Sequence, residues 1–118
     1  LYEDENVLAF LDIMPANKGH TLVMPKKHYE TLLDVPDPIV NDLMKIVKKI
    51  ARAMSSALAN NGFNVLINNK KVAGQLVPHL HIHIIPRFSD DGIKLNWMPN
   101  KYEDKEAEEY KRKITTFL

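Results

Sequence analysis

The sequence contains no cysteine, and this absence excludes disulfide bonds and thiolate-based metal sites from these residues. No apolar run approaches the roughly 20 residues of a bilayer-spanning helix, and no signal-peptide pattern is present. The formal net charge is only +1, with acidic and basic residues interspersed, so no region is marked as a general nucleic-acid or membrane-surface binder. We therefore expect a cytoplasmic protein with no nucleic-acid or membrane partner, whose affinity for any phosphate is local.

The 118 residues, 45% of them hydrophobic, suffice for one domain with a single core and are too few for two. We predict one domain over residues 1–118. The sequence opens at Leu1 without an initiator methionine, so we expect the natural start of the chain to lie further upstream.

Hydrophobic patterning predicts a mixed order of strands and helices along the chain. The predicted elements are strands at 6–13 and 20–24, a short helix at 27–33, a long amphipathic helix at 37–60, strands at 63–68 and 79–85, and a terminal helix within 102–118. Asp37 can cap the long helix, Pro38 suits its first position, and Asn61-Gly62 is expected to end it. This order indicates an α+β fold with an antiparallel sheet.

The most informative feature is a run in which histidine alternates with apolar residues, His79-Leu80-His81-Ile82-His83-Ile84-Ile85. Successive side chains of a β-strand point to opposite faces, so the run predicts three imidazoles on one face and apolar residues on the core face. The alternative is a half-buried strand that merely carries imidazoles on its polar side. Three stacked imidazoles would repel one another when protonated and gain nothing in packing, so we favour a site.

Adjacent histidines can divide the roles that attack on phosphorus requires. A neutral imidazole is a nucleophile near pH 7, and a neighbouring protonated imidazole can donate to a leaving group. The transition state concentrates negative charge that amide donors stabilise, and Asn68, Gly74 and Gln75 lie just before the run. Asp12, at the end of an apolar strand, is a candidate for holding ribose hydroxyls, with a turn-closing role as the alternative.

Three segments of the chain resemble the histidine triad (HIT) family and occur in the family's order. They are the run from His79 to Ile85, the segment from Leu8 to Pro15 followed by Gly19 to His28, and Ala73-Gly74-Gln75. The similarity covers residues 1–86. It implies a homodimeric α+β domain of HIT-like fold, with a five-stranded antiparallel sheet, that binds purine nucleotides and cleaves nucleoside phosphates through a nucleotidyl-histidine.

The resemblance also implies catalytic roles for four histidines. His81 matches the nucleophile, and His83 matches the group that contacts the phosphate and the leaving atom. His79 and His20 match the residues that orient the nucleophile and complete its hydrogen-bond network. His28 we interpret as a structural residue.

The nucleotide-binding positions implied by the resemblance lie in two regions of the chain. They are Asp12 for the ribose, Phe10 and Ile13 for the base, and Asn68, Gly74, Gln75 and Leu76 for the phosphate. Leu76 departs from the family pattern, because relatives of the Hint branch carry a hydroxyl residue there. Only its backbone N–H could therefore serve the phosphate.

We accordingly predict a hydrolase or transferase acting on adenosine phosphoramidates or dinucleoside polyphosphates, with no cofactor required for the chemistry. One alternative is a nucleotide-binding interaction protein with little catalysis. Another is a metal-dependent hydrolase in which a histidine of the run joins His20 around zinc. We expect no metal from these residues alone. Relatives that open with Cys-x-x-Cys hold a structural zinc, so the resemblance implies that a longer chain would hold one with His79 among its ligands.

Overall fold

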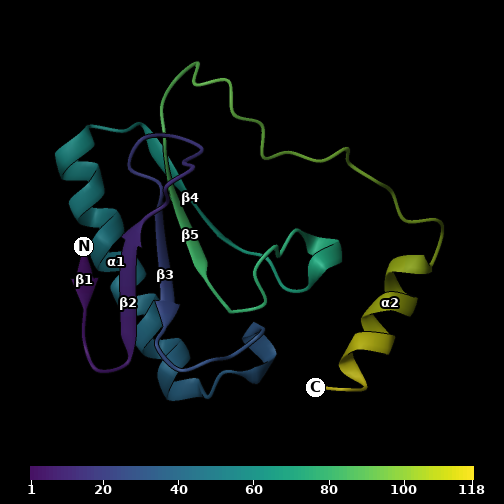
Figure 1. The fold of residues 1–118 in the computed structure, drawn as a ribbon. Coiled ribbons are helices and arrows are strands. Elements are labelled where there is room, and N and C mark those ends of the chain that lie inside the picture. Colours follow the sequence, from purple (N-terminus) through teal and green to yellow (C-terminus); the bar gives the residue numbers. More distant parts are fainter.

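A five-stranded antiparallel sheet with the strand order β1-β2-β3-β5-β4 forms the centre of the computed structural model, which describes residues 1–118 (Figure 1). The strands are β1 (Tyr2–Glu3), β2 (Val7–Leu11), β3 (Thr21–Pro25), β4 (Gly62–Ile67) and β5 (Ile82–Arg87). The helices are α1 (Asp37–Leu58) and α2 (Glu106–Thr115), with short 3₁₀ helices at Leu32–Asp34 and Lys71–Ala73. The α+β class predicted from the sequence is confirmed. Neither helix combines the length and the apolar character that crossing a bilayer requires.

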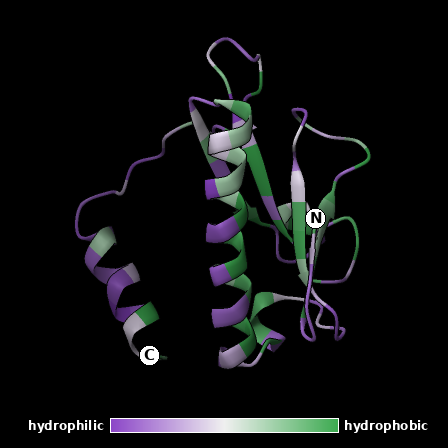
Figure 2. Cartoon of the chain, turned by 90° about the vertical axis from the view of Figure 1, so that its left-hand side faces the viewer, coloured by the Kyte–Doolittle hydropathy of each residue, from purple (hydrophilic) through white to green (hydrophobic).

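Helix α1 covers one face of the sheet because its apolar residues recur at three- and four-residue steps. Leu43, Val47 and Met54 are among its buried residues, and Figure 2 shows the apolar side of the helix turned toward the strands. The helix ends at Leu58, and the next residue, Ala59, caps it in a left-handed conformation with φ of 51°. The prediction that Asn61-Gly62 ends the helix is therefore wrong, since Gly62 already begins β4.

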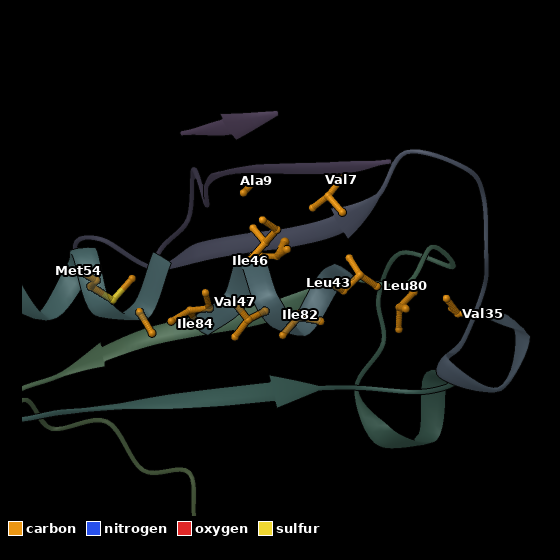
Figure 3. Close-up of a cluster of buried hydrophobic side chains, with 12 residues drawn as sticks. Val7, Ala9, Val35, Leu43, Ile46, Val47, Met54, Leu80, Ile82 and Ile84 are labelled. Carbon is orange, nitrogen blue, oxygen red and sulfur yellow. The ribbon is translucent and has the colours of Figure 1, made fainter. Parts of the chain in front are cut away.

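The core lies between α1 and alternate residues of the strands (Figure 3). Val7 and Ala9 of β2, Val23 of β3, and Ile82 and Ile84 of β5 are buried on this face. Their sequence neighbours point to the opposite face, which no helix covers. The predicted division of the sheet into a core face and an open face is thus present, and it leaves the open face to the polar side chains of β5.

Several boundaries differ from the sequence prediction. β5 begins at Ile82, so His79 and His81 lie before the strand, and Pro86 lies inside it, paired with Phe63. β1 is only two residues long and has no periodicity that the sequence could reveal. The short helix expected at 27–33 shrinks to the 3₁₀ turn at Leu32–Asp34.

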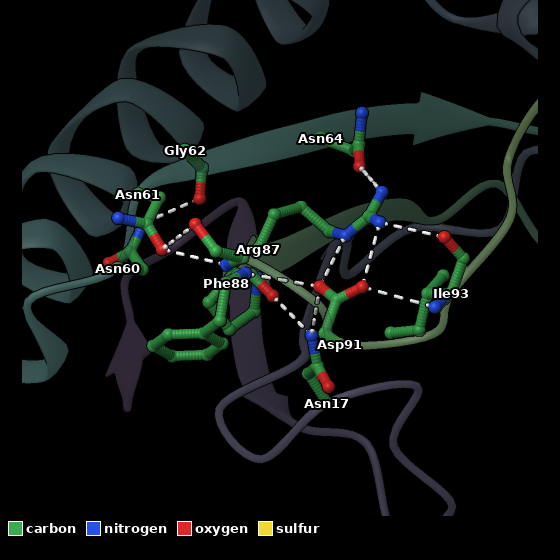
Figure 4. A network of polar contacts seen from close by, with 11 residues as sticks. Asn17, Asn60, Asn61, Gly62, Asn64, Arg87, Phe88, Asp91 and Ile93 are labelled. Atoms are coloured by element: carbon green, nitrogen blue, oxygen red, sulfur yellow. Dashed lines mark hydrogen bonds and ion pairs between the residues drawn. The ribbon is translucent and has the colours of Figure 1, made fainter.

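A polar network at the end of β5 holds the loop between β2 and β3 (Figure 4). The Asp91 carboxylate accepts hydrogen bonds from the Arg87 guanidinium at 2.8 and 3.0 Å, from the backbone N–H groups of Phe88 and Ile93, and from the Asn17 amide at 3.0 Å. These donors hold the pKa of Asp91 well below its usual range, the Arg87 side chain contributing most. The Asn17 amide also donates to the carbonyl of Pro86 at 2.8 Å, so the loop is tied to β5 at two points.

The C-terminal part of the chain leaves the sheet after this network. Residues 94–103 have no helix or strand, and α2 stands apart from the rest of the domain (Figure 1). No residue of α2 is buried, and Tyr110, Ile114 and Phe117 are exposed. The helix therefore takes no part in the core.

Candidate active site

The candidate site lies on the open face of the sheet, where three imidazoles meet. Strand pairing places Phe10 opposite Leu22, Leu22 opposite His83, and His83 opposite Leu66, so one row of side chains crosses four strands. The ring of His83 lies 4.9 Å from that of His81 and 5.2 Å from that of His20, centroid to centroid. His20 reaches this row because it directly precedes β3.

The cluster therefore consists of His20, His81 and His83 rather than of the three histidines of the run. The predicted stacking of His79 with the other two is wrong, because β5 begins at Ile82 and strand alternation does not extend back to position 79. The backbone of His79 nevertheless contributes, since its carbonyl oxygen lies 2.7 Å from His81 Nδ1.

That carbonyl determines the chemistry of His81. A carbonyl oxygen only accepts hydrogen bonds, so the proton of the neutral His81 ring resides on Nδ1. Nε2 then carries an unprotonated lone pair, and it makes no hydrogen bond within the chain. This is the tautomer and the freedom that a nucleophilic imidazole requires.

His20 and His83 form a hydrogen-bonded pair beside His81. His20 Nε2 lies 2.9 Å from His83 Nδ1, and the backbone N–H of Ala16 donates to His20 Nδ1 at 3.0 Å. Burial lowers the pKa of His20, opposed by the Asp12 carboxylate, whose oxygen lies 3.8 Å from His20 Nε2. Burial also lowers the pKa of His83, reinforced by its neighbours His81 and His20. Both rings are therefore neutral at pH 7.

Asp12 has the turn-closing role that was the alternative for its position. One carboxylate oxygen accepts from the backbone N–H of Met14 at 2.9 Å and so closes a turn. The other faces His20 at 3.8 Å. Ligand atoms of Asp12, His20 and His83 lie within 4.8 Å of one another, which makes them the group that could approach a metal ion.

The His79 ring turns away from the cluster and meets His28. His79 Nε2 lies 2.9 Å from the carbonyl oxygen of Pro25, and His79 Nδ1 lies 3.1 Å from His28 Nδ1. The sequence interpretation missed this pairing of His28, because 51 residues separate the two histidines and neither belongs to a periodic pattern that would bring them together.

An apolar groove of about 460 Å³ adjoins His81. It is lined by Leu8, Phe10, Leu22, Met24, Pro25, Lys26, Val77, His79 and His81. Phe10, which the resemblance implies for the base, lines this groove. Ile13 does not line the groove, and its side chain is 94% exposed.

Two of the predicted phosphate-binding residues have free donors and two do not. The backbone N–H of Gly74 donates to the carbonyl of Lys71 at 3.0 Å, and the Gln75 side chain is also engaged. The Asn68 side chain and the Leu76 backbone N–H make no hydrogen bond within the chain. Gly74, with φ of 97°, lies beside Asn68, because a Cβ there would be 3.5 Å from Asn68 Nδ2.

The side chain of Gln75, also predicted to bind the phosphate, makes its hydrogen bonds within the chain. Its amide nitrogen donates to the carbonyl of Glu30 at 2.6 Å, and its amide oxygen accepts from the backbone N–H of Lys70 at 2.8 Å. The side chain is buried, so it braces the loop instead of facing a ligand.

Comparison with known proteins agrees with this geometry. The HIT domain model matches residues 1–90. An uncharacterized HIT-like protein of Methanocaldococcus jannaschii is 49% identical over 113 residues, covering 94% of this chain and 87% of that protein. An adenosine 5'-monophosphoramidase of Saccharomyces cerevisiae is 42% identical over 98 residues, covering 82% of this chain and 60% of that protein. The crystal structure of a HIT family member from Bacillus subtilis superposes with a TM-score of 0.93 at 41% identity, covering 100% of this chain and 86% of that one. With this coverage and identity, the chain belongs to the HIT family.

Proposed function

We propose that this protein is a nucleotide hydrolase that cleaves adenosine phosphoramidates or dinucleoside polyphosphates through a covalent intermediate on His81. The observation that carries the proposal is the free Nε2 lone pair of His81, oriented by the His79 carbonyl at 2.7 Å and placed beside an apolar groove. The relatives named adenosine 5'-monophosphoramidase, in Saccharomyces cerevisiae and Schizosaccharomyces pombe, are 42% and 41% identical to this chain and support the substrate class.

The reaction would proceed in two displacements at phosphorus. His81 Nε2 forms a bond to phosphorus while the bond to the leaving group breaks, and the leaving group takes the electron pair and a proton from water. His83 adjoins His81 and donates a hydrogen bond to the phosphoryl or leaving atom. Water then attacks phosphorus, the bond to Nε2 breaks, and the ring recovers its lone pair while the nucleotide departs. The proton that the attacking water loses neutralises the hydroxide left by the first step. No cofactor takes part in either step.

The rest of the nucleotide would be held by residues around the cluster. The purine would occupy the apolar groove against Phe10 and Leu22. The unpaired donors of Asn68 and Leu76 would stabilise the negative charge that develops on the phosphate. The free Asp12 oxygen would accept from a ribose hydroxyl.

We further propose that the protein is a homodimer joined at β4. This strand is an edge of the sheet, with unpaired backbone groups along one side. Phe63 and Val65 of β4 are 48% and 40% exposed and line an apolar groove of about 610 Å³ shared with Met44 of α1. The test is the solution mass, expected near twice the 13.6 kDa of one chain. Val65→Asp is expected to halve it, and Val72→Asp, at a fully exposed position, is not.

A structural zinc is our proposal for the His28 and His79 pair in a longer chain. Two ring nitrogens 3.1 Å apart suit two corners of a tetrahedral zinc site. His79 also presents its other nitrogen to the Pro25 carbonyl, as zinc-binding histidines commonly do. A Zn-bound histidine triad family protein of Mycobacterium smegmatis, 36% identical with a TM-score of 0.74, supports this fit. Such a zinc would brace the two segments and supply no step of the reaction.

The deciding experiment measures AMP release from adenosine 5'-phosphoramidate and from diadenosine polyphosphates, with and without a chelator. We expect turnover that resists chelation and is lost in His81→Ala, while His28→Asn serves as the matched histidine control and keeps it. AMP binding without turnover in the unaltered protein would instead indicate a nucleotide-binding interaction protein. Loss of turnover on chelation would indicate the metal-dependent alternative.

A further inference from the structure

The loop between β2 and β3 aims a backbone amide at a catalytic ring. The N–H of Ala16 lies 3.0 Å from His20 Nδ1. A backbone N–H only donates, so His20 Nδ1 must be an unprotonated acceptor. The single proton of the neutral ring then resides on Nε2.

This assignment passes to the next ring. His20 Nε2 lies 2.9 Å from His83 Nδ1, so His20 donates and His83 Nδ1 accepts. The proton of neutral His83 consequently resides on Nε2, the nitrogen that points away from His20. His83 thus carries the opposite tautomer to His81, whose proton is held on Nδ1 by the carbonyl of His79.

We propose that the Ala16 amide holds the proton of His20 on Nε2, a contact that we call the tautomer lock. It makes His83 a permanent hydrogen-bond donor beside the nucleophile His81. This inference rests on the proposed function for its catalytic meaning. In the other arrangement, with the His20 proton on Nδ1, His83 would donate to His20 and turn a lone pair toward the phosphate. A lone pair there would repel the charge that the transition state develops.

The lock has two consequences for the chemistry of the cluster. An amide neither yields nor takes a proton, so the His20 and His83 pair ends at Ala16 and acts as a fixed dipole instead of a proton relay. Because His20 Nε2 carries a proton, it offers no lone pair to a metal, although it lies within 4.8 Å of ligand atoms on Asp12 and His83.

The amide is itself held in position by the surrounding loop. The backbone N–H of His20 donates to the carbonyl of Asn17 at 2.9 Å, and that of Asp12 donates to the carbonyl of His20 at 2.8 Å. The Asn17 side chain is bound to Pro86 and Asp91 at the end of β5. The direction of the Ala16 N–H is therefore set by contacts on both of its sides.

The first test reads the tautomers directly, by ¹⁵N nuclear magnetic resonance of the protein labelled at its histidine rings. At pH 7.5 we expect the proton on Nε2 of His20 and His83, and on Nδ1 of His81. A proton on Nδ1 of His20 or His83, or averaged signals from both tautomers, would overturn the proposal. This measurement needs no substrate, so it stands even if the proposed hydrolysis is not found.

The second test removes the amide hydrogen with Ala16→Pro and compares it with Ala16→Ser, which keeps the N–H. We expect both tautomers of His20 in the proline variant, and the wild-type pattern in the serine variant. If the protein is a hydrolase, kcat/KM should fall about 10²-fold in the proline variant alone, the scale for losing one donor to a developing charge. Wild-type tautomers in a folded proline variant would refute the lock. If that variant does not fold, the spectrum of the unaltered protein tests the proposal by itself.

Discussion

Replacing Gly19 by alanine is expected to destabilise the fold by about 2–5 kcal/mol, the sum of a backbone and a packing cost. Gly19 has φ of +102°, in the left-handed region where a Cβ costs roughly 1–2 kcal/mol. A Cβ there would also lie 2.7 Å from Leu58 Cδ1 and 3.3 Å from Pro86 Cγ. The leucine tip can rotate but the ring in β5 cannot, so overpacking adds about 1–3 kcal/mol.

Gly92→Ala is the matched control for this measurement. Gly92 also has a left-handed φ, of +73°, but no atom lies within 4 Å of a Cβ built there. Its substitution should therefore cost only the backbone term of about 1–2 kcal/mol. Urea unfolding of both variants at pH 7.5 measures the difference. Equal losses for the two glycines would refute the packing argument.

Three further predictions follow from burial and charge. Leu80→Ala, at a site with no exposed surface, should lower the free energy of unfolding in urea by about 2–5 kcal/mol. Leu33→Ala, at an exposed site, should change it by no more than about 0.5 kcal/mol. Similar losses in the two variants would contradict the assignment of Leu80 to the core. Because burial lowers the pKa of His20 and His83 from 6.5, the unfolded chain binds more protons just below that pH. Their contribution to stability is complete above pH 6.5 and declines as the pH falls through the folded pKa values. Thermal melts between pH 5 and 8 should therefore show a Tm that falls with falling pH, and His83→Asn should make this fall smaller. The same dependence of Tm on pH in that variant would argue against a contribution of His83 to it. Asp91→Asn should lower Tm at pH 7, where the depressed pKa keeps the carboxylate charged, and an unchanged Tm in calorimetry would show that the network does not stabilise the loop.

The spacing of apolar residues along the chain predicted the long helix and the core-facing residues of β5. The helix and the alternation of Ile82 and Ile84 toward the core follow from the spacing of apolar residues. The start of β5 does not, because a strand begins where its partners can pair with it. β4 ends at Ile67, which pairs with Ile82, and this leaves His79 and His81 beyond the ladder despite their alternating pattern.

The sequence predicted those parts of the candidate site in which residues close in sequence also lie close in space. His81 and His83 are close in sequence and in space, and the resemblance to the HIT family added His20 from a distant segment. Proximity in sequence misled at Gln75, whose amide is taken up by backbone groups of Glu30 and Lys70. His28 meets a residue 51 positions away, and the Ala16 amide meets His20 within a loop that has no regular periodicity, so no periodic sequence pattern signals either contact.

The contact that orients His81 is made by the carbonyl group of residue 79, and every amino acid has that group. A change of side chain at this position removes the ring from Pro25 and His28 but leaves the oxygen that faces His81. An alanine scan would therefore report only the contacts of the residue 79 side chain and overlook the contact of its carbonyl group with His81. Only chemical synthesis, with an ester in place of the amide after residue 79, would weaken the acceptor and reveal what the main chain contributes.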